Sequence, residues 1–426
     1  MIATRTPAFS VATALAAVLL LGAGTADLAA QPAAPTSAAS APSFAVRPEV
    51  AAALNQAIER HREGKVAEAR ALIEQAQTTT PNLQPAELTV LHRVRGLIEL
   101  QLEQYAAAAQ SLRAALETGA QSPADSLQCQ EALARAQFNL KDYTGAAETA
   151  RLAQAAGSRS PLLQTVLVRA TYLQNDYRGT IELLQEQQQR QGKLPVDELR
   201  LLASAYGQAG DEAGYLRVAE QLLREHGRKE YWPDLVSRVR QQPGWQARWD
   251  IDLQRLRLRL GLVVSADEFL ALADMEARAG LPAQALKVID AGYAKGVLGK
   301  GPNEAEHERL RSSLRRQAED DRKSLAAAAA RPPSASSDAR AAAAAFNTGA
   351  ALVSIGQAGP GLQMMKAALE GSLADPAQAR LQYGEALAEA GQPEQAAAAF
   401  RAIDAAEPLA LLARLWALAV SDPGQR

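Results

Sequence analysis

One stretch constrains the fold of this 426-residue chain more than any other, because it gives the length and chemistry of a unit that recurs. Residues 381–408 read LQYGEALAEAGQPEQAAAAFRAIDAAEP. Gly384 is small where one helix would cross its partner, and Gly391 would end the first helix. Ala396 and Phe400 then begin the apolar stripe of a second helix. The pattern predicts a hairpin of two helices.

The same spacing of small and medium residues recurs along the chain. The first helices carry Ala57, Gly96, Ala134, Val168, Ala203, Ala273, Gly349 and Gly384. The second helices carry Ala69, Ala108, Ala146, Thr180, Tyr215, Ala285, Gly361 and Ala396, at intervals of 39, 38, 34, 35, 70, 76 and 35 residues. The two long intervals each predict one further, degenerate unit.

This arrangement resembles the tetratricopeptide repeat of exported bacterial proteins. That family has small residues at positions 8 and 20, large ones at 7 and 11, an aromatic residue at 24 and proline at 32 of a repeat of about 34 residues. Two departures from the pattern are the absence of Trp at position 4 of the clear units and Arg95 at position 7 of one of them. The resemblance implies an all-α fold, a right-handed superhelical solenoid of helical hairpins that serves as a binding scaffold.

Composition agrees with an all-helical chain. Apolar residues make up 48% of the sequence and aromatic residues only 4%, and much of the apolar fraction is alanine, the strongest helix former. The formal net charge is −2, from 45 basic and 47 acidic residues. We therefore expect no nucleic-acid partner.

The N-terminus has the layout of a secretory signal peptide. Arg5 precedes an apolar run over residues 9–26, and small residues follow, so cleavage is expected after Ala26 or Ala30. Residues 1–30 are interpreted as the signal and residues 31–47 as a disordered Pro/Ala/Ser linker. The protein would then be periplasmic or secreted, without an integral membrane segment after cleavage; the alternative is an uncleaved N-terminal helix that anchors it in the membrane.

The rest of the chain is expected to form two arrays. Residues 48–300 would hold about seven hairpins, one of them degenerate. Residues 301–338 would form a long solvated, charged helix and a Pro/Ser linker, and residues 339–426 the last repeats with a capping helix. In the degenerate unit at 230–260, the apolar stripe is Trp249, Leu253, Leu256 and Leu260. Its tryptophans are interpreted as core residues rather than a stacking site for a ligand.

Catalytic and metal-binding patterns are absent from the sequence. The four histidines lie on separate repeats, and the single cysteine, Cys129, has no second cysteine for a disulfide or a metal site. No HExxH, GxSxG or phosphate-binding glycine loop occurs. We expect a protein that is not an enzyme and holds no metal or cofactor.

The resemblance also places candidate partner-binding residues. In the family, ligand contacts come from positions 2, 5, 9, 12 and 13 of the first helices, which line a concave groove. Carried onto this sequence, those positions give Arg93, Arg135, Phe138, Arg169, Tyr172 and Arg200. Arginines with neighbouring aromatic residues suit an extended peptide that carries a carboxylate. The alternative is that the arginines are solvated and paired with Glu131 or Glu198.

These observations favour an exported adaptor for protein or peptide partners of a cell-envelope complex. Two alternatives remain: a periplasmic ligand-binding module for a small anionic molecule or peptide, and a structural spacer that acts by self-association.

Overall fold

The computed structural model describes residues 46–330 and 335–421, and all regular structure within them is helical. The chain divides between residues 211 and 212 into two units, which are described separately below. The predicted all-α class and the tetratricopeptide-like hairpins are confirmed. The expected signal peptide and nearly all of the expected linker lie outside the described residues. Across the described ranges, no helix has both the length and the apolarity that crossing a bilayer requires.

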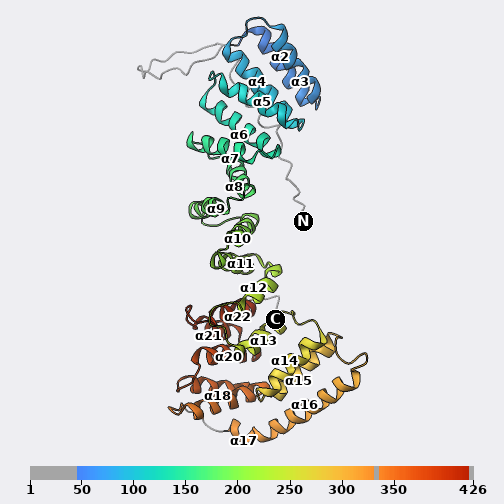
Figure 1. Ribbon diagram of the computed structural model, residues 1–426, viewed down its shortest axis with the longest axis vertical. Helices are drawn as coiled ribbons and strands as arrows, with labels where there is room; N and C mark the ends of the chain where they lie inside the picture. The colour runs from blue at the N-terminus through green and yellow to red at the C-terminus, as the bar shows by residue number, and fades with distance from the viewer. Residues whose placement is uncertain (1–45, 331–334, 422–426) are drawn as a thin grey trace, which may run out of the picture. The chain divides into compact units, whose positions relative to one another are not determined.

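The first unit is a succession of helical hairpins (Figure 1). Its helices are α2 (Pro48–Arg62), α3 (Val66–Thr79), α4 (Pro85–Gln101), α5 (Tyr105–Glu117), α6 (Pro123–Asn139), α7 (Tyr143–Ala155), α8 (Pro161–Leu173), α9 (Tyr177–Gln191) and α10 (Val196–Ala209). Proline opens the first turn of four of them, where no backbone donor is lost. Ser122 and Ser160 cap α6 and α8 by accepting hydrogen bonds from backbone N–H groups.

Within each unit, the repeat positions read from the sequence lie where the paired helices cross. All eight first-helix residues are buried, and so are seven of the eight second-helix residues; Tyr215 is half-buried. A Cβ atom on Gly96 would lie 2.6 Å from Leu112 Cγ, and one on Gly349 would lie 2.7 Å from the carbonyl oxygen of Gly361. Small residues are therefore required there because the helices approach too closely for a larger side chain.

A second regularity lies in the turns between paired helices. One residue in each turn has a positive φ: Gly64, Glu103, Lys141, Asn175, Gly210, Gly280, Gly356 and Gly391. These positions are spaced by the same intervals as the buried small residues. Glycine adopts this conformation without a steric cost, whereas Glu103 and Lys141 adopt it against one.

The second unit contains the degenerate repeats and the C-terminal ones. Its helices are α11 (Glu212–His226), α12 (Trp232–Val239), α13 (Asp250–Arg259), α14 (Ala266–Arg278), α15 (Pro282–Ala294), α16 (Glu304–Ser324), α17 (Ala326–Ala329), α18 (Ala339–Ser354), α19 (Ala358–Leu369), α20 (Pro376–Glu389), α21 (Pro393–Arg401) and α22 (Ala410–Ser421). Short 3₁₀ turns precede α12 at Lys229–Tyr231 and α13 at Ala247–Trp249.

The C-terminal hairpins of this unit fold back onto its first part. In Figure 1, α20 and α22 lie beside α13, and one continuous apolar core includes residues of all three helices. Trp249 donates from its indole to Asp375 at 3.2 Å, and Trp416 donates to the backbone carbonyl of Asp252 at 3.3 Å. The final helix thus packs on α12 and α13 as well as on the last hairpin.

Three predictions about this unit can be compared with the structure. Of the predicted stripe, Trp249, Leu253 and Leu256 are buried, whereas Leu260 is half-buried. The tryptophans of this unit pack in or against the core, with Trp245 half-buried. Helix α16 is long and charged, but it is not solvated on every side, because Leu314 and Ala318 are buried against neighbouring helices. The structure divides the chain at 211/212, whereas the sequence analysis placed its internal boundary in residues 301–338.

Candidate functional site

The first candidate surface comprises the arginines at equivalent positions of neighbouring first helices. Arg135 lies on α6 and Arg169 on α8, and these two helices pack against each other. Arg135 is half-buried and Arg169 is exposed. Within residues 46–330 and 335–421, neither guanidinium forms an ion pair, with Glu131, Glu198 or any other carboxylate. Burial raises the pKa of Glu198, and a hydrogen bond from Gln187 and the charge of Arg169 partly offset that effect.

The two aromatic candidates support their own hairpins. Phe138 makes an edge-to-face contact with Tyr143, with ring centroids 5.6 Å apart, and Tyr172 makes the same contact with Tyr177 at 5.4 Å. The Tyr172 hydroxyl also lies 2.7 Å from Ser204 Oγ on α10. Both rings remain partly exposed, so one part of each is fixed by packing and another part is accessible.

The other two candidates are placed differently. Arg93 is only 5% exposed and is paired with Asp125, and burial lowers its pKa. This arginine joins α4 to α6 and is not presented on an open surface. Arg200 is exposed and lies 4.0 Å from Asp197, one turn earlier on α10.

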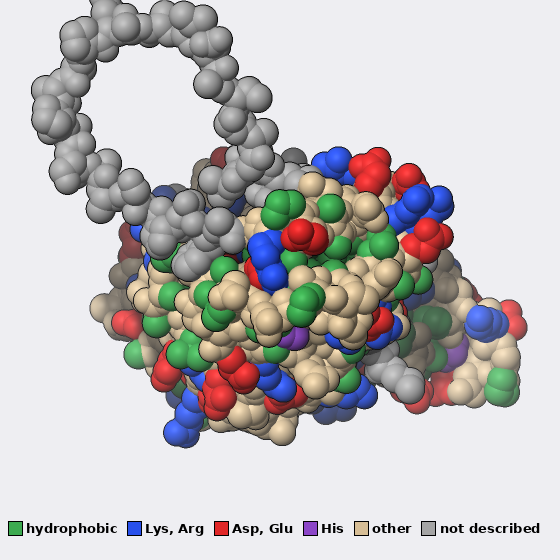
Figure 2. Space-filling view, turned by 90° about the horizontal axis from the view of Figure 1, so that it is seen from above, with side chains coloured by type: hydrophobic (Ala, Val, Ile, Leu, Met, Phe, Trp, Pro, Cys, Tyr) green, Lys and Arg blue, Asp and Glu red, His purple; other side chains and the backbone are tan. Residues whose placement is uncertain are grey.

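The charges visible on the surface are mixed. The face shown in Figure 2 carries acidic and basic side chains next to one another, without a large area of one sign. This agrees with the near balance of 45 basic and 47 acidic residues.

The second candidate site is a cavity of about 510 Å³ inside the second unit, a volume in the range of small-ligand pockets. Its walls come from α13, α14, α15, α18, α19, α20 and α22. The last two repeats supply their positions 9, 12 and 13: Ala350, Val353, Ser354, Glu385, Ala388 and Glu389. The apolar part of the cavity lining includes Leu258, Leu281 and Trp416.

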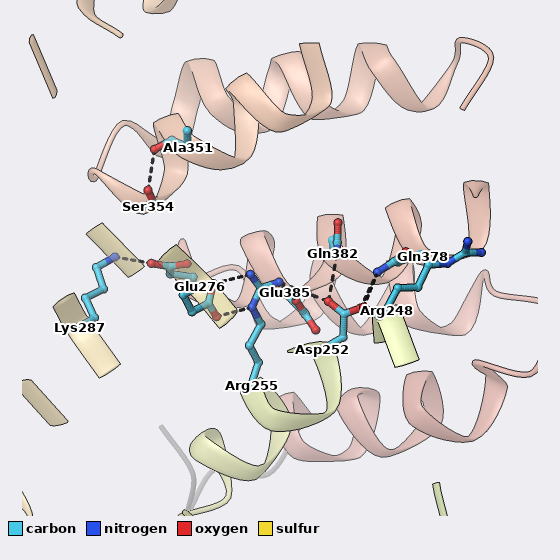
Figure 3. A network of polar contacts seen from close by, with 11 residues as sticks. Arg248, Asp252, Arg255, Glu276, Lys287, Ala351, Ser354, Gln378, Gln382 and Glu385 are labelled. Carbon is cyan, nitrogen blue, oxygen red and sulfur yellow. Dashed lines mark hydrogen bonds and ion pairs between the residues drawn. The ribbon is translucent and has the colours of Figure 1, made fainter. Parts of the chain in front are cut away.

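One wall of this cavity is a buried ionic cluster centred on Arg255 (Figure 3). Arg255 Nε and Nη2 donate to the two oxygens of Glu276, each at 2.7 Å. Its Nη1 donates to Glu385 Oε2 at 2.8 Å and to Asp252 Oδ1 at 3.3 Å. One guanidinium therefore joins α13 to α14 and α20, with the bidentate geometry that suits buried pairing.

The carboxylates of the cluster are almost completely removed from water. Asp252 and Glu276 have no exposed surface, and Glu385 is 8% exposed. Asp252 accepts further hydrogen bonds from the side-chain amides of Gln378 at 3.0 Å and Gln382 at 3.1 Å. Three carboxyl groups share one arginine, so the cluster would hold more negative charge than positive if all three were ionised.

Burial and like charges shift the acid–base behaviour of the cluster. Burial raises the pKa of Asp252 to about 6, although Arg255 and the two glutamines favour its charged form. Burial and the Asp252 charge raise the pKa of Glu385 well above its ordinary value. Burial opposes the charge of Arg255, but Glu276 and Glu385 outweigh it and raise the arginine pKa.

Neither this cluster nor the cavity was found from the sequence. Two features of the sequence could have indicated the cluster. Glu276 stands at position 11, where the clearest unit has the large apolar Leu387, and a charge at a core position indicates a buried ion pair. Glu385 stands at position 9, the position used to select Arg135 and Arg169.

No protein-family model matches this chain, and no curated protein matches it significantly. Among solved structures it is similar to the apo form of RapI, with 13% identity, 64% of this chain and 76% of that chain covered, and a TM-score of 0.34. A structure of Naa15/Naa10 bound to HypK-THB gives 16% identity, coverages of 85% and 65%, and a TM-score of 0.31. Yeast Tom70 gives 10% identity, coverages of 87% and 95%, and a TM-score of 0.25. The fold assignment rests on the hairpins of this chain itself.

Proposed function

We propose that this protein is an exported, non-catalytic scaffold that binds protein or peptide partners of a cell-envelope complex. The observation that carries the proposal is the pair Arg135 and Arg169, which occupy equivalent positions on packed helices and form no ion pair among the described residues. A guanidinium left without a carboxylate on a solvent-accessible surface is available to one from a partner.

Apolar side chains at the ends of the same two helices support a protein partner over a simple anion. Leu140, which follows α6, is 42% exposed, and Leu173, the last residue of α8, is 44% exposed. Phe138 and Tyr172 lie one turn or less before them in the sequence and are partly exposed. A peptide in extended conformation with acidic and apolar side chains would satisfy both the charge and the apolar surface.

Export is the second part of the proposal, and it rests on the sequence of residues 1–30. Its test is the N-terminus of the mature protein in the envelope fraction, which we expect between Asp27 and Ser40. A soluble cytosolic protein that retains Met1 would refute export without bearing on partner binding.

Partner binding is tested by affinity capture of the mature protein followed by quantitative mass spectrometry. The test variant is Arg135→Ala/Arg169→Ala, and its matched control is Arg315→Ala/Arg316→Ala, which removes two exposed arginines from α16. We expect partners held by wild type and by the control to be lost from the test variant. If the contact is desolvated, the affinity for an isolated partner should fall by about 2–5 kcal/mol. Equal small losses in both variants would contradict the proposed surface.

A further inference from the structure

Three residues that line the cavity in the second unit each have a buried polar atom without a partner among the described residues. Arg259 Nε, Gln284 Oε1 and Glu385 Oε1 are buried and form no hydrogen bond within the described residues. All three residues line the same cavity. Buried polar atoms are usually paired, and three of the nine buried unpaired atoms among the described residues belong to residues of this one cavity, which favours a polar ligand there.

One of these residues, Glu385, is held in place by the ionic cluster. Arg255 and Arg259 are four residues apart on α13 and therefore lie on the same face of the helix. Arg255 holds Glu385 through its Oε2 atom at 2.8 Å, which leaves Oε1 as the free atom of that carboxylate. A guanidinium donor, Arg259, thus lies one turn from Arg255, and a carboxyl acceptor, Glu385, is bonded to it. The neighbouring Glu389 is already paired with Lys287.

We propose that this cavity binds a zwitterionic amino acid or short peptide. Its carboxylate would accept from Arg259, and its ammonium would donate to Glu385 and Gln284. An inorganic anion would leave both acceptors unpaired, and a simple amine would leave Arg259 unpaired. A bound ammonium also stabilises the ionised form of Glu385 in its acidic surroundings.

The remaining wall indicates the kind of side chain that the ligand carries. Leu258, Leu281, Val288, Val353, Met365 and Trp416 give the cavity an apolar part. A cavity of about 510 Å³ has room for an amino acid or a dipeptide, whereas a long extended chain would not fit inside it. We expect ligands with an apolar side chain to bind more tightly than those with a charged one.

The proposal is tested by calorimetry on the dialysed full-length protein, with the common L-amino acids and apolar dipeptides as probes. For the tightest probe, two analogues are compared with it: the amine that lacks the carboxylate and the acid that lacks the ammonium. We expect the probe to bind. The affinity of each analogue should be at least about tenfold lower, because each loses a hydrogen bond to a charged group. Absence of binding by every probe, or equal binding of probe and analogues, would overturn the proposal.

Variants provide an independent measurement. Arg259→Gln and Glu385→Gln should each weaken binding of the probe by about tenfold or more. Their matched controls, Arg316→Gln and Glu394→Gln, change exposed residues outside the cavity and should leave the affinity unchanged. Wild-type affinity in both cavity variants would also overturn the proposal. The arginine pair on α6 and α8 is in the first unit. If the cavity binds no ligand, the proposed partner surface is unaffected, and loss of the partner surface would likewise leave the cavity proposal standing.

Discussion

Arg255 is the residue whose loss should most damage the second unit. The substitution Arg255→Met removes hydrogen bonds to Glu276, Glu385 and Asp252, all of which are at least nine-tenths buried. Truncating one partner of a buried ion pair costs about 3–5 kcal/mol, because the remaining charges stay buried without compensation. At 2–4 °C per kcal/mol for a unit of this size, the melting temperature should fall by about 6–20 °C.

The stability lost by Arg255→Met should be larger at higher pH. The pKa of Asp252 is raised to about 6 and that of Glu385 is raised well above its ordinary value, so protonation of these acids relieves the uncompensated charge. The destabilisation by Arg255→Met should therefore be largest near pH 7–8 and smaller near pH 5. Thermal unfolding followed by circular dichroism at several pH values measures both quantities.

A matched control lies one turn further along the same helix. Arg259 lines the same cavity but has no ion-pair partner among the described residues, so Arg259→Met should cost little or nothing. The double variant Arg255→Met/Glu276→Leu should recover part of the loss, because it removes a buried carboxylate together with its cation. Equal losses for Arg255→Met and Arg259→Met, or a loss for Arg255→Met that does not change with pH, would refute this account of the cluster.

Three further predictions concern stability and can be checked by thermal or urea unfolding. As pH rises from 4 to 7, the Asp252→Asn variant should gain up to about 3 kcal/mol of stability relative to wild type. An acid with a raised folded-state pKa stabilises the wild type below its unfolded pKa, and this contribution is lost as pH passes through about 6. Parallel pH profiles of the two proteins would contradict the assigned shift. Gly384→Leu should cost about 1–3 kcal/mol because even a Cβ atom would lie 2.5 Å from the Phe400 ring, and full tolerance would contradict the close crossing of α20 and α21. Lys141→Gly should stabilise the protein and Gly391→Ala should destabilise it, by about 1 kcal/mol each, because both residues have positive φ. A Cβ atom on Gly391 would have no atom within 4 Å, so its cost would come from the backbone. Changes of the same sign in the two variants would exclude a backbone origin.

The hairpins could be predicted because their chemistry is local. Gly384 and Ala396 are twelve residues apart, and the crossing of two adjacent helices needs small residues at both places. The same short-range pattern repeats in every clear unit, so a departure in one unit is compensated by agreement in the others. The turn residues with positive φ, Glu103 and Lys141 among them, follow the same intervals.

The packing of α20 and α22 on α13 in the second unit could not be predicted in the same way. Arg255 and Glu385 are separated by 130 residues, and no local pattern requires that they meet. The stripe of α13 indicated that Trp249 and Leu253 would be buried, but it did not indicate that α20 and α22 would cover them. The division into units was likewise set by these distant contacts rather than by the Pro/Ser composition of residues 331–338.

Arg135, Arg169 and Glu385 occupy the same repeat position but have different surroundings, and the two binding proposals rest on this difference. In the first unit, position 9 carries Arg135 and Arg169, which have no ion-pair partner and keep some contact with solvent. In the second unit, position 9 carries Glu385, and the packing of α13 against α20 buries it beside Arg255. An extended partner can be bound by side chains that reach solvent on successive helices, whereas a cavity of about 510 Å³ admits only a small molecule or a short peptide. The two proposals therefore concern different kinds of ligand, because packing by a distant helix turns an open repeat position into a buried one.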